Sequence, residues 1–156
     1  NWFRANQLLL IGEVGATNVW NLPSPSDLRY NADGTDTGGG ADVTSGNLNN
    51  PQTQTRGFPT AFSWGYRIAA KADYNNAFGT AFTLSPLLAF NQDVNGTTPG
   101  PGGNFIDGRK SITVGVQANY LDKWIFDLNY TNYFGGGEFN LLQDRDFASF
   151  VVKYSF

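Results

Sequence analysis

The chain of 156 residues contains no cysteine and no histidine. Without cysteine there is neither a disulfide framework nor thiol chemistry. Without histidine, Ser-His-Asp and Cys-His catalysis and histidine-based zinc sites are excluded. The carboxylates show no spacing that indicates a catalytic pair. We therefore expect that the protein is not an enzyme, and that it has no catalytic residue, no metal and no cofactor.

Charge and long apolar runs are also scarce. Charged residues make up 15% of the chain, against roughly 25% in soluble domains. The net charge is −3 and no basic cluster is present, so nucleic acid is not an expected partner. No apolar run approaches the roughly 18 residues of a membrane-spanning helix. Any membrane crossing must therefore be made by strands, because only helices and closed barrels satisfy their backbone groups in lipid.

Apolar and polar residues alternate in six segments that turn-forming residues separate. Side chains of a strand point alternately to its two faces, so this period predicts strands. The predicted strands are residues 7–17, 62–74, 78–91, 109–120, 124–134 and 146–156. Pro86 lies inside the third of them and predicts a local bulge or kink, because proline cannot donate to a β-ladder.

The last predicted strand ends on an apolar face. Phe156, Tyr154, Val152 and Phe150 share one parity, and mostly polar residues share the other. This ending is typical of a strand that closes an outer-membrane β-barrel, whose outer face meets lipid and whose ends lie in aromatic belts. The alternative is the last strand of a soluble β-sandwich.

Long and short connections alternate along the chain. The predicted long loops cover residues 18–59, 92–108 and 135–144, and short turns join the other strands. This asymmetry favours the barrel, with the long loops extracellular and the short turns periplasmic. Asn31 to Asp36 has the look of a calcium loop but lacks the downstream glutamate of an EF-hand, so a solvated turn is expected there.

The chain also resembles a Gram-negative outer-membrane family catalogued as domain of unknown function 1302. The resemblance lies in F-S-W-G-Y-R (62–67), D-V-N-G-T-T-P (93–99), N-F-I-D-G-R (104–109), N-Y-F-G-G-G-E-F-N-L-L-Q-D-R-D-F (132–147) and the ending V-K-Y-S-F. It implies an outer-membrane β-barrel of undefined activity, thought to help hydrophobic compounds such as lipids or steroids to cross or reach the outer membrane. It also implies a longer protein, of which this chain is the C-terminal part.

The number of predicted strands agrees with that size. The smallest single-chain bacterial barrels have eight strands. We therefore expect residues 1–156 to be a single wall segment of a larger all-β, antiparallel up-and-down transmembrane barrel. Further strands are expected before Asn1, and any signal peptide is expected to precede Asn1 or to have been removed.

The two faces of the predicted strands define two sets of candidate residues. The polar face would line the barrel interior with Glu13, Arg67, Lys71, Asp73, Asp127 and Lys153. These side chains either contact a solute or pair with one another and fill the interior. The aromatic residues expected at the membrane girdles are Trp64, Tyr66, Tyr74, Tyr120, Trp124, Tyr130, Tyr154 and Phe156. A ligand-binding aromatic track is the alternative for them.

Two functions are compatible with these patterns. The first is an outer-membrane channel or transporter for small or hydrophobic compounds. The second is a surface interaction or structural barrel whose long extracellular loops bind a partner. The expected partners are outer-membrane lipid, the barrel-assembly machinery that would read the last strand, and a hydrophobic small-molecule solute.

Overall fold

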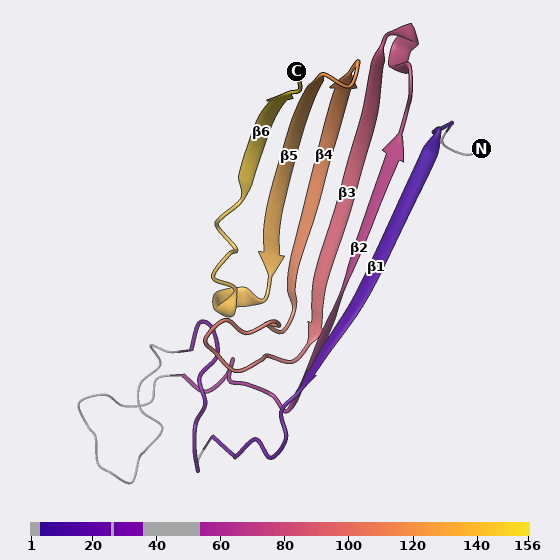
Figure 1. Cartoon of the computed structure of the whole chain (residues 1–156). Coiled ribbons are helices and arrows are strands. Elements are labelled where there is room, and N and C mark those ends of the chain that lie inside the picture. Colours follow the sequence, from indigo (N-terminus) through magenta and orange to yellow (C-terminus); the bar gives the residue numbers. More distant parts are fainter. Residues whose placement is uncertain (1–3, 26, 36–53) are drawn as a thin grey trace.

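The computed structural model of the chain describes residues 4–25, 27–35 and 54–156. These residues form six strands and two short 3₁₀ turns (Figure 1). The strands are β1 (Gln7–Asn18), β2 (Phe62–Asp73), β3 (Phe82–Asn95), β4 (Arg109–Tyr120), β5 (Trp124–Gly135) and β6 (Phe147–Tyr154). The turns are η1 (Ala77–Gly79), between β2 and β3, and η2 (Gly137–Phe139), between β5 and β6.

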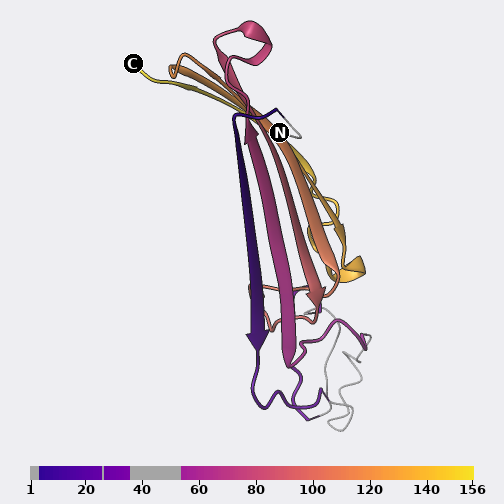
Figure 2. The ribbon, with the colours of Figure 1, turned by 90° about the vertical axis from the view of Figure 1, so that its right-hand side faces the viewer.

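The strands form one antiparallel sheet in the order β1-β2-β3-β4-β5-β6. Each strand pairs with its neighbours in the chain, and the edge-on view shows a single layer (Figure 2). The predicted all-β, antiparallel up-and-down arrangement is thus confirmed. Among the described residues β1 pairs only with β2 and β6 only with β5, so the sheet is open at both edges.

The short and long connections lie at opposite ends of the sheet (Figure 1). Residues 74–81 and 121–123 make the short turns, at the end where β1 begins and β6 ends. The other end gathers the described parts of the β1–β2 connection (19–25, 27–35 and 54–61) and the loops of residues 96–108 and 136–146. The predicted alternation of long and short connections is confirmed.

The third predicted strand was placed too early. It was expected from Phe78 to Asn91, but β3 begins at Phe82 and continues to Asn95. Phe78 lies in η1 with a left-handed φ of 56° and is 93% exposed. Its apolar side chain continued the alternating pattern, although its backbone conformation cannot belong to a strand. The second long loop therefore begins at residue 96 instead of 92, and the third spans 136–146 instead of 135–144.

Pro86 causes no bulge. It is in register with Val116 on β4, and the pairs Lys71↔Leu87 and Tyr74↔Leu84 on its other side keep the same register. The ladder between β2 and β3 is interrupted between those two pairs, where proline has no N–H to donate. The register shift of this strand pair lies instead between Trp64 and Gly65.

The register aligns residues of one kind into rows across the sheet. One face carries apolar rows, such as the row of Leu10, Ala70, Leu88, Val114 and Tyr130. The other face carries polar rows, such as the row of Glu13, Arg67, Asn91, Ser111 and Tyr133. We call these the apolar face and the polar face. The strands have the predicted division into an apolar and a polar face, except that Phe78 lies outside β3.

The sheet has almost no buried apolar core. Among the described residues, the buried apolar side chains are Ala32 and Ile106, and both lie in loops. Large side chains of the apolar face are exposed, among them Leu88 at 50% and Phe150 at 65%. Apolar surface of this extent marks a contact with another protein or with a membrane. None of the described helical segments has the length and apolar character to cross a membrane.

Two strand glycines allow a direct test of the register. A Cβ at Gly65 would lie 2.6 Å from the backbone oxygen of Gln92 on β3, whereas a Cβ at Gly12 meets nothing within 4 Å. We expect Gly65→Ala to lower the free energy of unfolding by about 1–3 kcal/mol, because the two strands must move apart. Gly12→Ala should leave it unchanged or raise it by up to about 1 kcal/mol. Urea unfolding followed by tryptophan fluorescence measures both, and equal midpoints would contradict the proposed strand contact.

Candidate functional site

The six predicted charged candidates lie on the polar face. Glu13 and Arg67 are register partners on β1 and β2. Lys71 and Asp73 follow Arg67 on the same face of β2. The other two candidates, Asp127 on β5 and Lys153 on β6, belong to rows of this face nearer the short turns. The register thus gathers charges from four strands on one surface.

Three of these charges are held by neighbours. Lys71 Nζ lies 3.8 Å from Asp73 Oδ1, and the same oxygen accepts a hydrogen bond of 2.5 Å from Ser85 Oγ. Asp127 accepts hydrogen bonds from the side-chain amides of Gln117, at 3.2 Å, and of Asn129. These contacts fix the side chains in place, as expected of structural pairing.

Glu13, Arg67 and Lys153 are different. The salt bridges within 4.0 Å among the described residues involve other side chains. Arg67 is exposed and has no hydrogen-bond partner within the described part of the chain. Its guanidinium is therefore available to a solute.

The sequence pattern did not predict an ion pair at the long-loop end of the polar face. Arg109 Nε donates to Asp93 Oδ2 at 2.7 Å, and the backbone N–H of Ile106 donates to the same oxygen at 3.0 Å. Asp93 was assigned to a loop because β3 was expected to end at Asn91. The parity of Ala89 and Asn91 continues through Asp93, and this signal could have placed it on the polar face.

Two hollows of the polar face share Arg67 in their walls. The first has a volume of about 250 Å³ and is lined by Glu13, Gly65, Arg67 and Phe105, among others. The second has a volume of about 260 Å³, and its lining includes Arg67, Asn91, Ser111 and Tyr133. A smaller hollow of about 130 Å³ lies nearer the short turns, beside Lys71 and Asp127.

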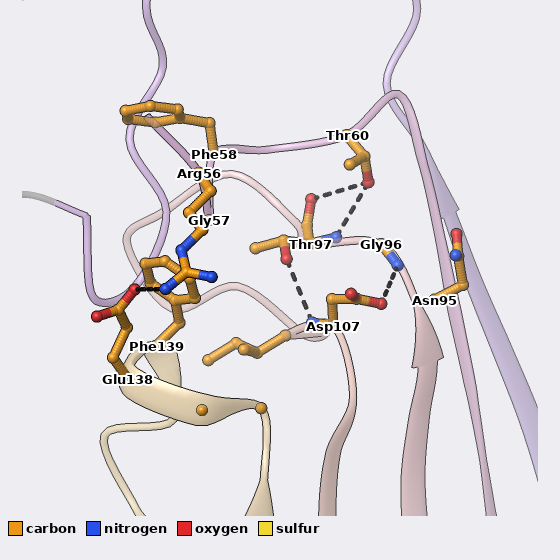
Figure 3. Close-up of a pocket in the computed structure, with 13 residues that line it drawn as sticks. Arg56, Gly57, Phe58, Thr60, Asn95, Gly96, Thr97, Asp107, Glu138 and Phe139 are labelled. Atoms are coloured by element: carbon orange, nitrogen blue, oxygen red, sulfur yellow. Dashed lines mark hydrogen bonds and ion pairs between the residues drawn. The ribbon is translucent and has the colours of Figure 1, made fainter. Parts of the chain in front are cut away.

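A larger pocket of about 460 Å³ lies among the loops (Figure 3). Arg56 Nη2 lies 3.0 Å from Glu138 Oε1 at its rim, where both side chains are mostly exposed. On its other side, the Thr97 N–H donates to Thr60 Oγ1 at 3.0 Å and the Gly96 N–H donates to Asp107 Oδ1 at 3.1 Å. The pocket thus joins all three long loops, and its polar groups mostly satisfy one another.

No metal centre is formed by the described residues, since no three Cys, His, Asp or Glu side chains gather to hold an ion. Asn31 to Thr35, the described part of the calcium-like segment, form a tight turn. Thr35 is fully buried, and its hydroxyl accepts from the Ala32 N–H and donates to the Ala32 carbonyl, each at 2.8 Å. Asp36 lies outside the described residues.

Most predicted girdle aromatics lie near the two ends of the apolar face. At the short turns, the ring centroids of Trp124 and Tyr154 are 4.6 Å apart, and Phe156 meets Tyr154 edge-on at 5.4 Å. Phe82, which was not among the predicted girdle residues, packs on Tyr120 with ring centroids 4.8 Å apart and extends this aromatic row. The register aligns Phe82, Tyr120, Trp124 and Tyr154.

The remaining girdle candidates are less uniform. Trp64 and Tyr66 lie near the long loops, where the Tyr66 hydroxyl donates to Gln92 Oε1 at 3.0 Å. Tyr74 lies at the short-turn end and bridges to Leu84. Tyr130 lies between the two ends of β5, and its hydroxyl reaches Asp146 at 3.0 Å.

A family model matches the whole chain, residues 1–156, and its description is a protein of unknown function, DUF1302. The chain belongs to the DUF1302 family. The resemblance found in the separated sequence blocks is thereby confirmed for the full length of the chain. Neither the curated proteins nor the solved structures gave a match. Membership of DUF1302 therefore leaves the activity to be argued from the two faces of the sheet.

Asp146 provides a test of how the third long loop joins the sheet. Its carboxylate accepts hydrogen bonds from the backbone N–H of Tyr133 at 2.9 Å, from Asn132 Nδ2 at 2.5 Å and from the Tyr130 hydroxyl. These donors, the Tyr133 N–H first, lower the pKa of Asp146 below its ordinary value of 3.8. A lowered pKa means that the attachment is complete above pH 3.8 and is lost as the pH falls through the lowered value.

We expect the Tyr133 amide resonance to titrate with a midpoint below 3.8 and to lose its pH dependence in Asp146→Asn. An NMR titration of the ¹H–¹⁵N shift from neutral to acidic pH measures the midpoint. A midpoint at or above the ordinary value would show that the ionised carboxylate does not hold this amide.

Proposed function

We propose that this chain forms part of the wall of an outer-membrane β-barrel that acts as a channel or transporter for small or hydrophobic compounds. The apolar face would contact lipid and the polar face would line the aqueous interior. The observation that carries the proposal is an exposed apolar face that is bounded at both ends by aromatic or polar rows.

The height of the apolar face supports a lipid contact. One boundary is the aromatic row of Tyr120, and the other is the row of Tyr66, Gln92, Lys110 and Phe134 near the loops. Tyr120 lies ten residue steps after Lys110 on β4, a length of about 33 Å along a strand. At the usual strand tilt of roughly 35–45°, this corresponds to about 25 Å across the membrane, the height of the apolar band of such barrels.

The open edges also support the proposal. β1 and β6 each present unpaired backbone groups within the described part of the sheet. Such edges attract further strands, and a barrel removes them by closure. We therefore expect additional strands beside β1 and β6, from the same polypeptide or from another copy. The aromatic β6 is the strand that we expect the barrel-assembly machinery to recognise.

A transport role follows from the polar face in such a barrel. Charges that line an interior tune which solutes pass. Glu13, Arg67 and Lys153 lack salt-bridge partners within 4.0 Å among the described residues, whereas Lys71 and Asp73 contact each other. We expect the protein reconstituted in liposomes to show ion conductance or uptake of small solutes. A folded barrel without conductance and without uptake of polar or hydrophobic solutes would contradict this role.

The loop pocket favours a second candidate, a barrel whose extracellular loops bind a partner. Its 460 Å³ volume and the contacts among the long loops give these loops a defined surface. This candidate does not need an open interior. A folded but non-conducting protein that retains partner binding would favour it over transport.

Two adjacent leucines separate a lipid-facing from a water-facing position. Leu88 lies in the middle of the apolar face and is 50% exposed, whereas Leu87 lies on the polar face in the hollow that Asp127 also lines. We expect Leu88→Arg to destabilise the membrane-inserted protein by about 2–4 kcal/mol, because the charge enters hydrocarbon. Leu87→Arg should have a smaller effect, because the new charge would face water, with Asp127 to attract it and its register partner Lys71 to repel it.

The urea midpoint of folding in lipid vesicles measures the effect of the two substitutions, and heat-modifiable migration on SDS gels reports whether each variant is folded. The positions are neighbours on β3, so backbone context and composition are matched. Equal destabilisation by both substitutions would contradict the proposal that the apolar face contacts lipid.

A further inference from the structure

The β3–β4 loop covers part of the polar face. Phe105 lies against two glycines of that face, because a Cβ at Gly65 would be 3.0 Å from Phe105 Cε1 and a Cβ at Gly15 would be 3.3 Å from Phe105 Cζ. Gly15 and Gly65 are register partners on β1 and β2. Two glycines side by side thus let an aromatic ring from a loop approach the sheet.

Hydrogen bonds hold this loop in place. The Asp93 carboxylate accepts hydrogen bonds from the Ile106 N–H and from the Arg109 side chain, and both residues follow Phe105 in the chain. The Phe105 N–H donates to Thr98 Oγ1 at 3.0 Å, and the Thr98 N–H donates to the Phe105 carbonyl at 3.0 Å. Thr98 is 5% exposed and Ile106 is 3% exposed. Phe105 therefore occupies a defined position over the polar face.

Arg67 lies beside this ring and between the two hollows of the polar face. Lys71 contacts Asp73 and Arg109 contacts Asp93, so these two cations of the same face are already paired. Arg67 has no salt-bridge partner within 4.0 Å among the described residues. Glu13 faces it across the strand pair and is the nearest carboxylate in register.

The hollow on the far side of Arg67 from Glu13 has an excess of positive charge. Its polar-face lining contains Arg67 and Arg109 against the single carboxylate of Asp93, and Lys110, which the register assigns to the opposite face, is not counted. Ser111 in its wall is buried and accepts a hydrogen bond of 2.9 Å from Asn91 Nδ2. The Ser111 hydroxyl hydrogen is therefore left to donate. Cations together with a hydroxyl donor match an anionic acceptor.

We propose that Arg67 is the recognition group for a small organic anion that binds in this hollow. The ring of Phe105, beside the hollow, would narrow the interior of the proposed barrel. A guanidinium donates two parallel hydrogen bonds to a carboxylate, which gives orientation as well as attraction. The volume of about 260 Å³ lies just below the roughly 300–1,000 Å³ of pockets for drug-sized ligands, so a small solute fits it. Glu13 partly offsets the attraction, which suits a site that a transported solute must also leave.

Only the effect of this site on transport rests on the proposed barrel function. Binding of the anion is therefore tested first and separately. The probes are benzoate and its neutral analogue benzamide, and their binding to the folded protein in lipid nanodiscs is followed by saturation-transfer NMR. We expect the wild type to prefer benzoate and Arg67→Gln to lose that preference, with benzoate affinity falling about tenfold.

Three variants serve as controls. Lys71→Gln removes a cation of the same strand and face that is paired with Asp73, and it should keep the benzoate preference. Arg67→Lys should keep part of the benzoate preference, because lysine keeps the positive charge but lacks the planar guanidinium that donates two parallel hydrogen bonds. Phe105→Ala should increase ion conductance without abolishing the preference for benzoate, because the ring leaves the path while Arg67 remains.

The outcomes separate the site from the transport role. Equal binding of benzoate and benzamide to the wild type, or an unchanged preference in Arg67→Gln, would overturn the proposed site even where solutes are transported. Arg67-dependent benzoate binding by a protein that conducts nothing would support the site and contradict the channel. Heat-modifiable migration on SDS gels shows for each variant that the protein tested is folded.

Discussion

The antiparallel register is the constraint on which the rest of the structure depends. Side chains alternate between faces with a period of two, so a slip by one residue would move every side chain of a strand to the other face. Leu10, Ala70 and Leu88 share one row, and Glu13, Arg67 and Asn91 share another, because three strands keep one register. With almost no buried apolar core in the described residues, the ladder holds the sheet and its surroundings must cover the apolar face.

The same register determines how the β3–β4 loop packs on the polar face near the long loops. It brings Gly15 beside Gly65, and the missing side chains make room for Phe105. The register shift between Trp64 and Gly65 lies at this point, where the backbone of β3 approaches Gly65 closely. Asp93 then connects the end of β3 to the loop and to the start of β4. The packing of the β3–β4 loop on the sheet thus arises from one local arrangement of strands.

The sequence predicted the parts of this arrangement that depend on alternation alone. Arg109–Tyr120 was predicted with the bounds of β4, because its alternation is strict and ends in a tight turn. Phe78 was misplaced because apolar alternation does not report a left-handed backbone. The Asp93–Arg109 pair and the contact of Phe105 with the glycines join residues far apart in the chain. Their proximity follows from the register between strands, which one sequence does not supply.

The two faces and the two open edges of the sheet each need to be covered, and closure of the sheet into a barrel would cover them together. In the proposed membrane the apolar face would meet hydrocarbon, yet unpaired backbone groups at the edges could not remain there. Closure by further strands would satisfy both, and it would also curve the polar rows around an interior. The row of Arg67 would then surround the same space into which the β3–β4 loop places Phe105. In the proposed barrel, the charge of Arg67 and the ring of Phe105 would thus lie at one level of the interior, and a solute would pass both.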